Sequence, residues 1–299
     1  MMTRIADAVE GIGHSFDRPA ILDDGRRTAT DRPGVAGEPC LHTYDLLAEA
    51  VDLLAAELRA AGVRSGDRVA VYIHFGYPAL LAALAVDYAG AVAVPLDIRE
   101  ECARTEQKLR VAGAHWVLGH TGDGHIVEDV VGVDDSPMTT VAEDYTLVAM
   151  PSPAACSEPA AGFAFCTPDG SRCHVVDAAV LTDTARTVAR QWNISADDTV
   201  ALDTELGEFE AFLAATATLI SGATLCLTRR AEHGRHAGLA TMLVHGPTAA
   251  ERSADAPGAA LSGHWSAAAP ESAGHELRQL RFAARPQNFA DSGQIRRCG

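Results

Sequence analysis

The chain has 299 residues, 47% of them hydrophobic, and this apolar content predicts a folded protein with ample material for a buried core. Its 40 acidic residues outnumber 24 Lys and Arg, so the formal charge of -16 argues against general nucleic-acid binding. Seven cysteines form no Cys-x-x-Cys pair, and the N-terminus is too acidic for a signal peptide. We therefore expect a cytoplasmic protein without structural zinc.

The first part of the chain alternates helical and strand patterns. Apolar residues recur at helical spacing after Thr43, a plausible N-cap, and Gly62 provides the helix stop. The alternation of strand and helix is typical of parallel strands joined by right-handed crossovers. The predicted elements are, in chain order, a helix over 43–61, a strand over 68–73, a helix over 78–89, a strand over 91–94 ended by Pro95, a helix over 100–111 and a strand over 115–118.

A second block follows a stretch rich in Gly, Asp, Ser and Pro. Its predicted elements are strands over 162–166, 199–202 and 223–227, helices over 177–192 and 205–220, and one further candidate strand over 239–244. Polar residues interrupt the charge-free stretch 211–228, so no membrane span is predicted. The division is a first α/β subdomain over 1–118, an irregular connection over 119–161, a second α/β subdomain over 162–228, and a weakly patterned, partly disordered region over 229–299.

Several segments resemble one known family. Tyr88–Asp97 reads Y-A-G-A-V-A-V-P-L-D and resembles the K-A-G-A-x-x-V-P-L-D segment of the acyl-adenylate-forming ligases, which include acyl-CoA synthetases and nonribosomal peptide synthetase adenylation domains. Thr43–Leu46, Gly66–Val71 and Ser221–Leu225 resemble the T-Y-x-x-L, G-D-R-V-A-V and x-G-A-T-L stretches, in the expected order. The resemblance covers about residues 5–227. It implies an α/β fold of parallel sheets with flanking helices, like an incomplete N-terminal portion of such a ligase.

The family resemblance also implies ATP and magnesium, which these ligases use to convert a carboxylate into an acyl-AMP. Their phosphate loop resembles T-S-G-S-T-G-x-P-K-G and follows a strand, so that backbone N–H groups and a lysine surround the polyphosphate. The equivalent stretch here is Phe165–Val175, with candidate anion-binding residues Thr167, Gly170, Ser171, Arg172 and His174.

This loop departs from the family pattern in three ways. It is shorter and lacks the lysine, Asp169 would repel phosphate, and Pro168 has no N–H to donate. An ordinary exposed turn is the alternative interpretation. Neither the Y-G-x-T-E segment nor the later Y-x-T-G-D segment is found, nor is the C-terminal domain with its catalytic lysine. We predict no catalytic residue, and expect the only lysine, Lys108, on the solvent face of its helix.

Three other groups of residues could each be either a chemical site or an ordinary structural feature. His120, Asp123 and His125 lie in a Gly-rich stretch that could wrap a metal, although turn residues explain it equally well and no metal site is predicted. Cys166 and His174 are close in sequence, as a nucleophile and its base would be, but no orienting residue accompanies them.

The only basic cluster follows the last predicted strand of the second block. It includes Arg229, Arg230 and Arg235, together with His233 and His236. These residues can simply be solvated charges that follow a strand, and the more specific hypothesis is that they form a docking patch for an acidic carrier. An incomplete sheet would also leave apolar edges, which favour a protein partner or self-association.

Three functions remain open from the sequence. The first is a degenerate adenylation-like protein that is non-catalytic alone and acts as a binding or interaction partner in a nonribosomal peptide or acyl-activation pathway. The second is an ATP-dependent, carboxylate-activating ligase fragment that works with a complementary chain. The third is a truncated, non-functional gene product. The missing motifs favour the first and third hypotheses over the second.

Overall fold

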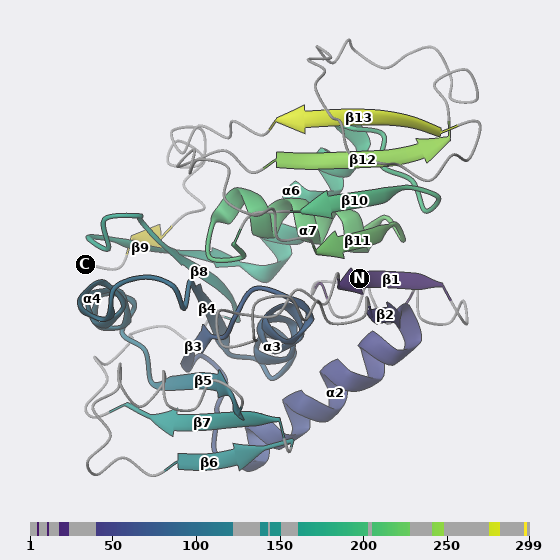
Figure 1. The fold of residues 1–299 in the computed structure, drawn as a ribbon. Coiled ribbons are helices and arrows are strands. Elements are labelled where there is room, and N and C mark those ends of the chain that lie inside the picture. The colour runs from purple at the N-terminus through teal and green to yellow at the C-terminus, as the bar shows by residue number, and fades with distance from the viewer. Residues whose placement is uncertain are drawn as a thin grey trace, which may run out of the picture.

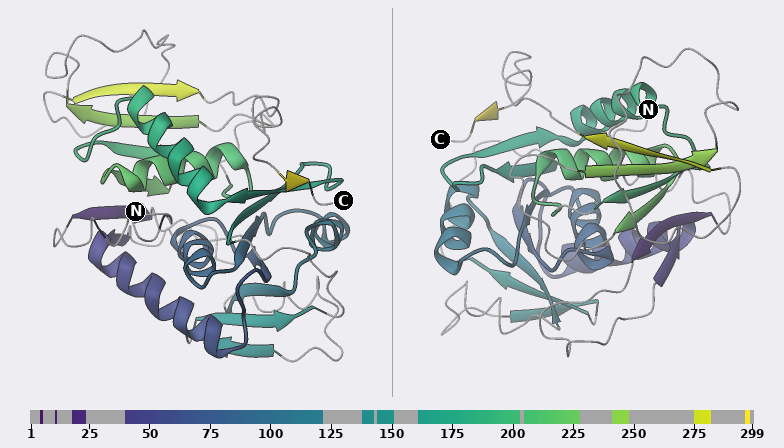
Figure 2. Two further views of the ribbon diagram at one scale, coloured as in Figure 1. Left: turned by 180° about the vertical axis from the view of Figure 1, so that it is seen from behind. Right: turned by 45° about the horizontal axis from the view of Figure 1, so that its top comes forward.

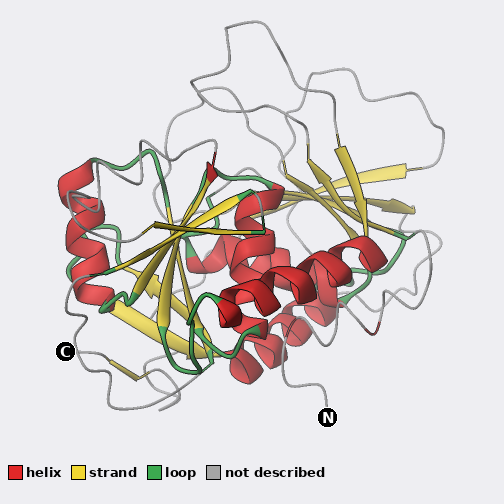
Figure 3. Cartoon of the chain, turned by 90° about the horizontal axis from the view of Figure 1, so that it is seen from below, coloured by secondary structure: helices red, strands yellow, loops and turns green. Residues whose placement is uncertain are grey.

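The computed structural model describes residues 18–23, 40–121, 138–142, 144–150, 161–202, 205–227, 241–247, 275–281 and 296–297, together with Ile5 and Gly11. These residues form two β-sheets with helices packed between and around them (Figure 1). Figure 3 shows the two sheets from below, with helices filling the space between them. The predicted α/β class with parallel sheets is confirmed.

The larger sheet has eight strands in the order β14-β9-β8-β4-β3-β5-β7-β6. Its centre is parallel, since β3 pairs in parallel with β4 and β5, and β4 pairs in parallel with β8. The outer strands β9, β7, β6 and β14 are antiparallel to their neighbours. The strands are β3 (Arg68–Tyr72), β4 (Val92–Leu96), β5 (Trp116–His120), β6 (Met138–Val141), β7 (Tyr145–Ala149), β8 (Gly162–Cys166), β9 (Cys173–Asp177) and β14 (Arg296–Arg297).

The smaller sheet has six strands in the order β13-β12-β10-β11-β1-β2. Strands β10, β11 and β1 are parallel, and the others are antiparallel. The strands are β1 (Pro19–Asp23), β2 (Cys40–Thr43), β10 (Thr199–Leu202), β11 (Thr224–Leu227), β12 (Thr241–Pro247) and β13 (His275–Arg281). Each sheet thus combines early and late strands: β1 and β2 join β10 and β11, whereas β8 and β9 join β3 to β5.

Five helices connect the strands within the described parts of the chain: α2 (Tyr44–Ala60), α3 (Tyr77–Tyr88), α4 (Cys102–Ala112), α6 (Ala178–Gln191) and α7 (Phe209–Ile220). Helix α3 is apolar on nearly every side, and Ala82, Ala83 and Val86 are fully buried. The main core lies between the sheets and includes residues of α2, α3, α6 and α7. A smaller core lies under α4, on the other face of the larger sheet.

Helix α2 ties the two sheets together. It contacts β1 and β2 at one end and β6 at the other, as the view from behind shows (Figure 2). Near its start the buried Tyr44 hydroxyl lies 2.9 Å from the Leu219 carbonyl oxygen and 2.7 Å from that of Ala223. The hydroxyl therefore anchors α2 to the end of α7 and the turn before β11.

The structure differs from the predicted secondary structure in several elements. Strand β4 does not end before Pro95 as predicted but continues to Leu96. Strand β3 pairs with β4 over the full length of β4, whereas β8 pairs only with Val92 and Ala93. The missing Pro95 N–H therefore falls beyond the pairing with β8. Strands β6 and β7 lie within the connection predicted to be irregular, β9 follows the candidate loop directly, and β13 and β14 lie in the weakly patterned C-terminal region.

Within the described ranges, no helix has both the length and the apolar character needed to cross a bilayer.

Candidate functional site

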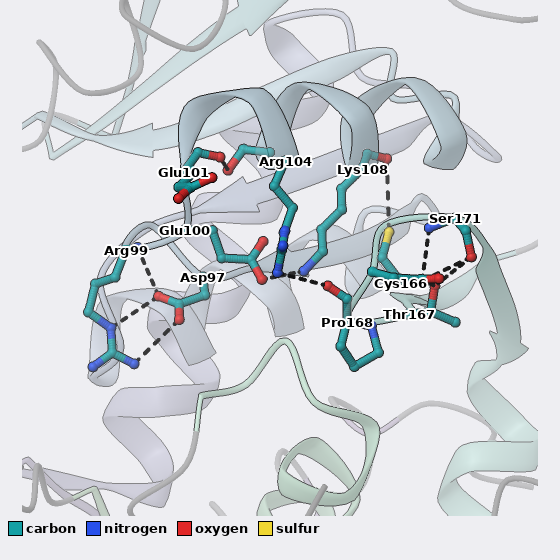
Figure 4. A network of polar contacts seen from close by, with 12 residues as sticks. Asp97, Arg99, Glu100, Glu101, Arg104, Lys108, Cys166, Thr167, Pro168 and Ser171 are labelled. Atoms are coloured by element: carbon teal, nitrogen blue, oxygen red, sulfur yellow. Dashed lines mark hydrogen bonds and ion pairs between the residues drawn. The ribbon is translucent and has the colours of Figure 1, made fainter. Parts of the chain in front are cut away.

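Four of the five candidate anion-binding residues, Thr167, Gly170, Ser171 and Arg172, lie at the tip of the β8–β9 hairpin, and the fifth, His174, lies in β9. Cys166, the last residue of β8, is paired across the sheet with Cys173, the first residue of β9. Residues 167–172 form the loop between them, beside helix α4 (Figure 4). The loop follows a strand, as the family pattern implies, and leads directly into an antiparallel strand.

The loop is folded around the carboxylate of Asp169. One oxygen, Oδ1, accepts hydrogen bonds from the Thr167 hydroxyl at 2.5 Å, the Ser171 hydroxyl at 2.9 Å and the Ser171 backbone N–H at 3.1 Å. These bonds stabilise the ionised form, and the Thr167 hydroxyl contributes most. They lower the pKa of Asp169 from 3.8 to about 2. An anion of the chain itself therefore occupies the donors at the centre of this loop.

The backbone donors of the loop are also used internally. Thr167 N–H donates to the Arg172 carbonyl at 2.9 Å, and Gly170 N–H donates to the Thr167 carbonyl at 2.8 Å. Arg172 N–H donates to the Thr167 hydroxyl oxygen at 3.1 Å. Pro168 has no N–H. The residues present fit a polyphosphate poorly in this arrangement, because the N–H groups of Thr167, Gly170, Ser171 and Arg172 and the hydroxyls of Thr167 and Ser171 already have acceptors within the loop.

The structure brings together some of the predicted site residues and separates others. Thr167, Gly170 and Ser171 form one turn, in which Gly170 adopts a left-handed φ of 68°. Arg172 is exposed. His174 lies in β9 opposite Phe165, on the other face of the hairpin, because successive side chains of a strand point to opposite faces.

The same alternation excludes the hypothetical Cys166–His174 dyad. Cys166 and Cys173 form a cross-strand pair, so their side chains share one face, while His174 follows on the opposite face. The nucleophile hypothesis is wrong, because nearness in sequence across a hairpin does not place these two side chains together.

Lys108 is buried against the loop, so its predicted position on the solvent face of the helix is wrong. Its side chain is 9% exposed, and Nζ lies 2.6 Å from Oε1 of Glu100. A Cβ added at Gly170 would lie 3.4 Å from Lys108 Cγ, which shows how closely the helix and loop pack. On the same helix, Arg104 donates to the Pro168 carbonyl at 3.4 Å (Figure 4). Glu100 neutralises the only lysine, which therefore does not act as a free phosphate ligand.

A second group of charges lies beyond β4. Arg99 contacts Asp97 at 3.2 Å and Glu205 at 2.5 Å, so it joins the end of β4 to the segment before α7. Burial raises the pKa of Glu208, with further contributions from the negative charges of Glu210 and Asp97. These carboxylates add negative potential to this end of the sheet and disfavour a polyphosphate there.

The remaining predicted sites have fewer described residues. His120 ends β5, and its ring packs edge-on against Tyr145 with centroids 5.7 Å apart. Its suggested metal-binding companions, Asp123 and His125, lie outside the described residues, as do the basic-cluster residues Arg229, Arg230, His233, Arg235 and His236. Among the residues that are described, no three metal-ligating side chains are grouped to hold an ion.

Comparison with known sequences locates the family resemblance in the N-terminal part of the chain. Residues 21–158 match the family described as AMP-binding enzyme. A feruloyl-CoA synthase of an Amycolatopsis species is 49% identical over 80 residues, a match covering 26% of this chain and 16% of the synthase. Phosphinothricin tripeptide synthetase PhsC of Streptomyces viridochromogenes is 34% identical over 128 residues, covering 41% of this chain and 12% of PhsC. These matches thus span only a small part of each relative.

Comparison with solved structures extends the likeness to most of the chain. The N-terminal subdomain of NpsA from Klebsiella oxytoca, in complex with 3-hydroxyanthranilyl-AMSN, matches with a TM-score of 0.54 at 19% identity. The match covers 78% of this chain and 55% of the NpsA chain. At this identity the likeness shows the fold alone, and it confirms the fold that the sequence motifs indicated.

Proposed function

We propose that this chain, which carries the N-terminal part of the acyl-adenylate-forming ligase fold, is catalytically silent alone and acts as a binding or interaction partner in a biosynthetic pathway. The pathway would be of the kind in which its relatives act, nonribosomal peptide synthesis or acyl activation. The observation that carries this proposal is the loop over 167–172, whose donors bind the carboxylate of Asp169.

Electrostatics support the proposal. A nucleotide polyphosphate would have to displace or approach the ionised carboxylate of Asp169, which carries the same sign of charge. The only lysine of the chain, Lys108, forms an ion pair with Glu100, and the net charge of the chain is -16. Binding would therefore require both breaking the internal hydrogen bonds and overcoming repulsion, with no free lysine at the loop to offset these costs.

The surface of α2 supports an interaction role. Leu46 and Leu53 lie two helical turns apart on one face, and their exposed fractions are 52% and 59%. Leu41 on the preceding strand is 52% exposed. Exposed large apolar side chains on one helix face offer apolar surface that a partner could bury. The proposal includes a protein partner, and an acidic carrier that binds at Arg229, Arg230 and Arg235 is one candidate.

ATP–pyrophosphate exchange tests the catalytic half of this proposal. The purified chain is assayed with magnesium, ATP and a panel of amino, aryl and fatty acids, beside an active adenylate-forming ligase as a positive control. We expect exchange at the level of the no-enzyme blank for every acid. Exchange that depends on one acid would show that the chain is a working ligase.

One observation favours a second candidate, an ATP-dependent adenylating ligase that works with a complementary chain. The NpsA structure is also an N-terminal subdomain, and it holds 3-hydroxyanthranilyl-AMSN. The exchange assay is repeated after adding the separate C-terminal domain of a family ligase. Acid-dependent exchange only in the mixture would favour this second function over the silent one.

A further inference from the structure

The hairpin that carries the loop also brings two thiols together. Thr167 N–H donates to the Arg172 carbonyl, so this pair is hydrogen-bonded, and the next pair, Cys166 with Cys173, occupies a non-hydrogen-bonded position. At such positions the Cα atoms lie about 4.5 Å apart and the side chains are closest. This spacing falls within the range of roughly 4.4–6.8 Å that disulfides span, so the backbone need not move.

The surroundings of the pair differ from those of the other described cysteines. Helix α4 covers both side chains; Cys173 is 1% exposed, and Cys166 is half-buried and thus reachable from solvent. The Cys166 thiol also contacts the Lys108 carbonyl at 3.9 Å. A hydrogen bond from Cys173 lowers the pKa of Cys166, Lys108 and Arg68 add to this effect, and burial and Glu100 oppose it. Cys166 is therefore the thiol better suited to attack.

From this geometry we propose that Cys166 and Cys173 are a reversible oxidation site, which a hydroperoxide converts from a dithiol to a disulfide. The Cys166 thiolate attacks one oxygen of hydrogen peroxide, the O–O bond breaks, and hydroxide leaves, which gives a sulfenic acid. Cys173 sulfur then attacks Cys166 sulfur, the S–O bond breaks, and water forms. The departing hydroxide takes the Cys173 proton to form this water, and the proton that Cys166 lost on ionisation neutralises the first hydroxide, so two thiols and one peroxide give one disulfide and two waters.

The disulfide would close the base of the loop over 167–172. It would join the two strand ends that flank the turn around Asp169, and so restrain that turn in the conformation that it has in this structure. Among the described cysteines that lie in strands this arrangement is specific to the pair, since Cys40 faces Asp23 across β2 and β1, and Cys226 faces Leu22 and Ala201 across its neighbours.

Tryptic mapping tests the proposal directly, because Arg172 lies between the two cysteines. Trypsin releases Cys166 in the peptide 111–172 and Cys173 in the peptide 173–186. A Cys156→Ser background leaves Cys166 as the only thiol in the first peptide. After treatment of the folded protein with hydrogen peroxide and alkylation, we expect the two peptides to appear linked, and to separate on reduction with dithiothreitol.

Two variants define the controls. Cys226→Ser removes a half-buried thiol elsewhere and should leave the yield of linked peptide unchanged. Cys173→Ser should abolish the linked peptide and leave Cys166 as a sulfenic acid that dimedone traps. The proposal is overturned if peroxide oxidises other cysteines while both Cys166 and Cys173 remain alkylatable in the protein without the Cys173 change. The result does not depend on nucleotide binding and therefore stands apart from the proposed function.

Discussion

Two neighbouring regions of the larger sheet differ in what holds them in place. The segment from β3 through α3 to β4 is fixed by apolar burial, and nearly every side chain of α3 and β4 is buried. The β8–β9 loop is fixed by hydrogen bonds to one carboxylate at the protein surface. Apolar packing holds the first region, while internal hydrogen bonds to one carboxylate hold the loop. The comparison shows that two adjoining parts of one sheet can depend on different kinds of interaction.

The largest expected effect on stability comes from a substitution in the segment from β3 through α3 to β4. Leu84→Ala in α3 removes a side chain that is 1% exposed and leaves a cavity between the sheets. We expect the free energy of unfolding to fall by about 2–5 kcal/mol. The matched control is Leu53→Ala in α2, where the side chain is 59% exposed and the change should stay within about 0.5 kcal/mol. Urea unfolding measures both, and equal losses would contradict the burial described for α3.

A smaller effect on stability is expected at Lys108, in helix α4 beside the β8–β9 loop. Lys108→Met removes the ammonium group that contacts Glu100 and leaves a largely buried carboxylate without its cation. We expect a loss of about 1.5–3 kcal/mol, measured by urea unfolding at neutral pH. Adding Glu100→Gln to this variant should recover part of the loss, because the unpaired charge is then absent. No recovery in the double variant would show that the ion pair is not the cause.

The smallest effect on stability is expected in the loop itself. The pKa of Asp169 is lowered to about 2 in the folded chain, so this group favours the folded state above its ordinary pKa of 3.8 and loses that contribution as the pH falls through about 2. Asp169→Ala should therefore be slightly less stable than the natural chain at neutral pH. The difference should shrink as the pH falls from 3.8 towards 2. Unfolding measured across this pH range gives the result, and a constant difference would contradict it.

The scaffold could be predicted from the sequence because apolar periodicity determines it. Helices α2 and α3 and strands β3 and β5 lie within about two residues of their predicted ends. Strands β6 and β9 were missed, since three residues of β6 are exposed and β9 begins with Cys173 and His174. Neither strand shows the continuous apolar run that identifies a buried parallel strand.

The loop was harder to predict, because its properties depend on three-dimensional closure. The sequence predicted that Asp169 is unfavourable for phosphate, but not that Thr167 and Ser171 bind its carboxylate. The spacing of Asp169 and Ser171 is that of an Asx turn, which is a signal that could have indicated this. The burial of Lys108 left no such signal, since it depends on Glu100 eight residues earlier and on the hairpin packed above the helix.

Calorimetric titration of Mg·ATP into the natural chain and into Asp169→Ala tests the central claim most directly. If the Asp169 carboxylate occupies the donors of the loop, the natural chain should give no saturable heat up to millimolar nucleotide. The variant should show detectable binding, because the Thr167 and Ser171 donors are released. Saturation in the micromolar range with the natural chain, unchanged in the variant, would contradict the claim that the Asp169 carboxylate closes this loop to nucleotide.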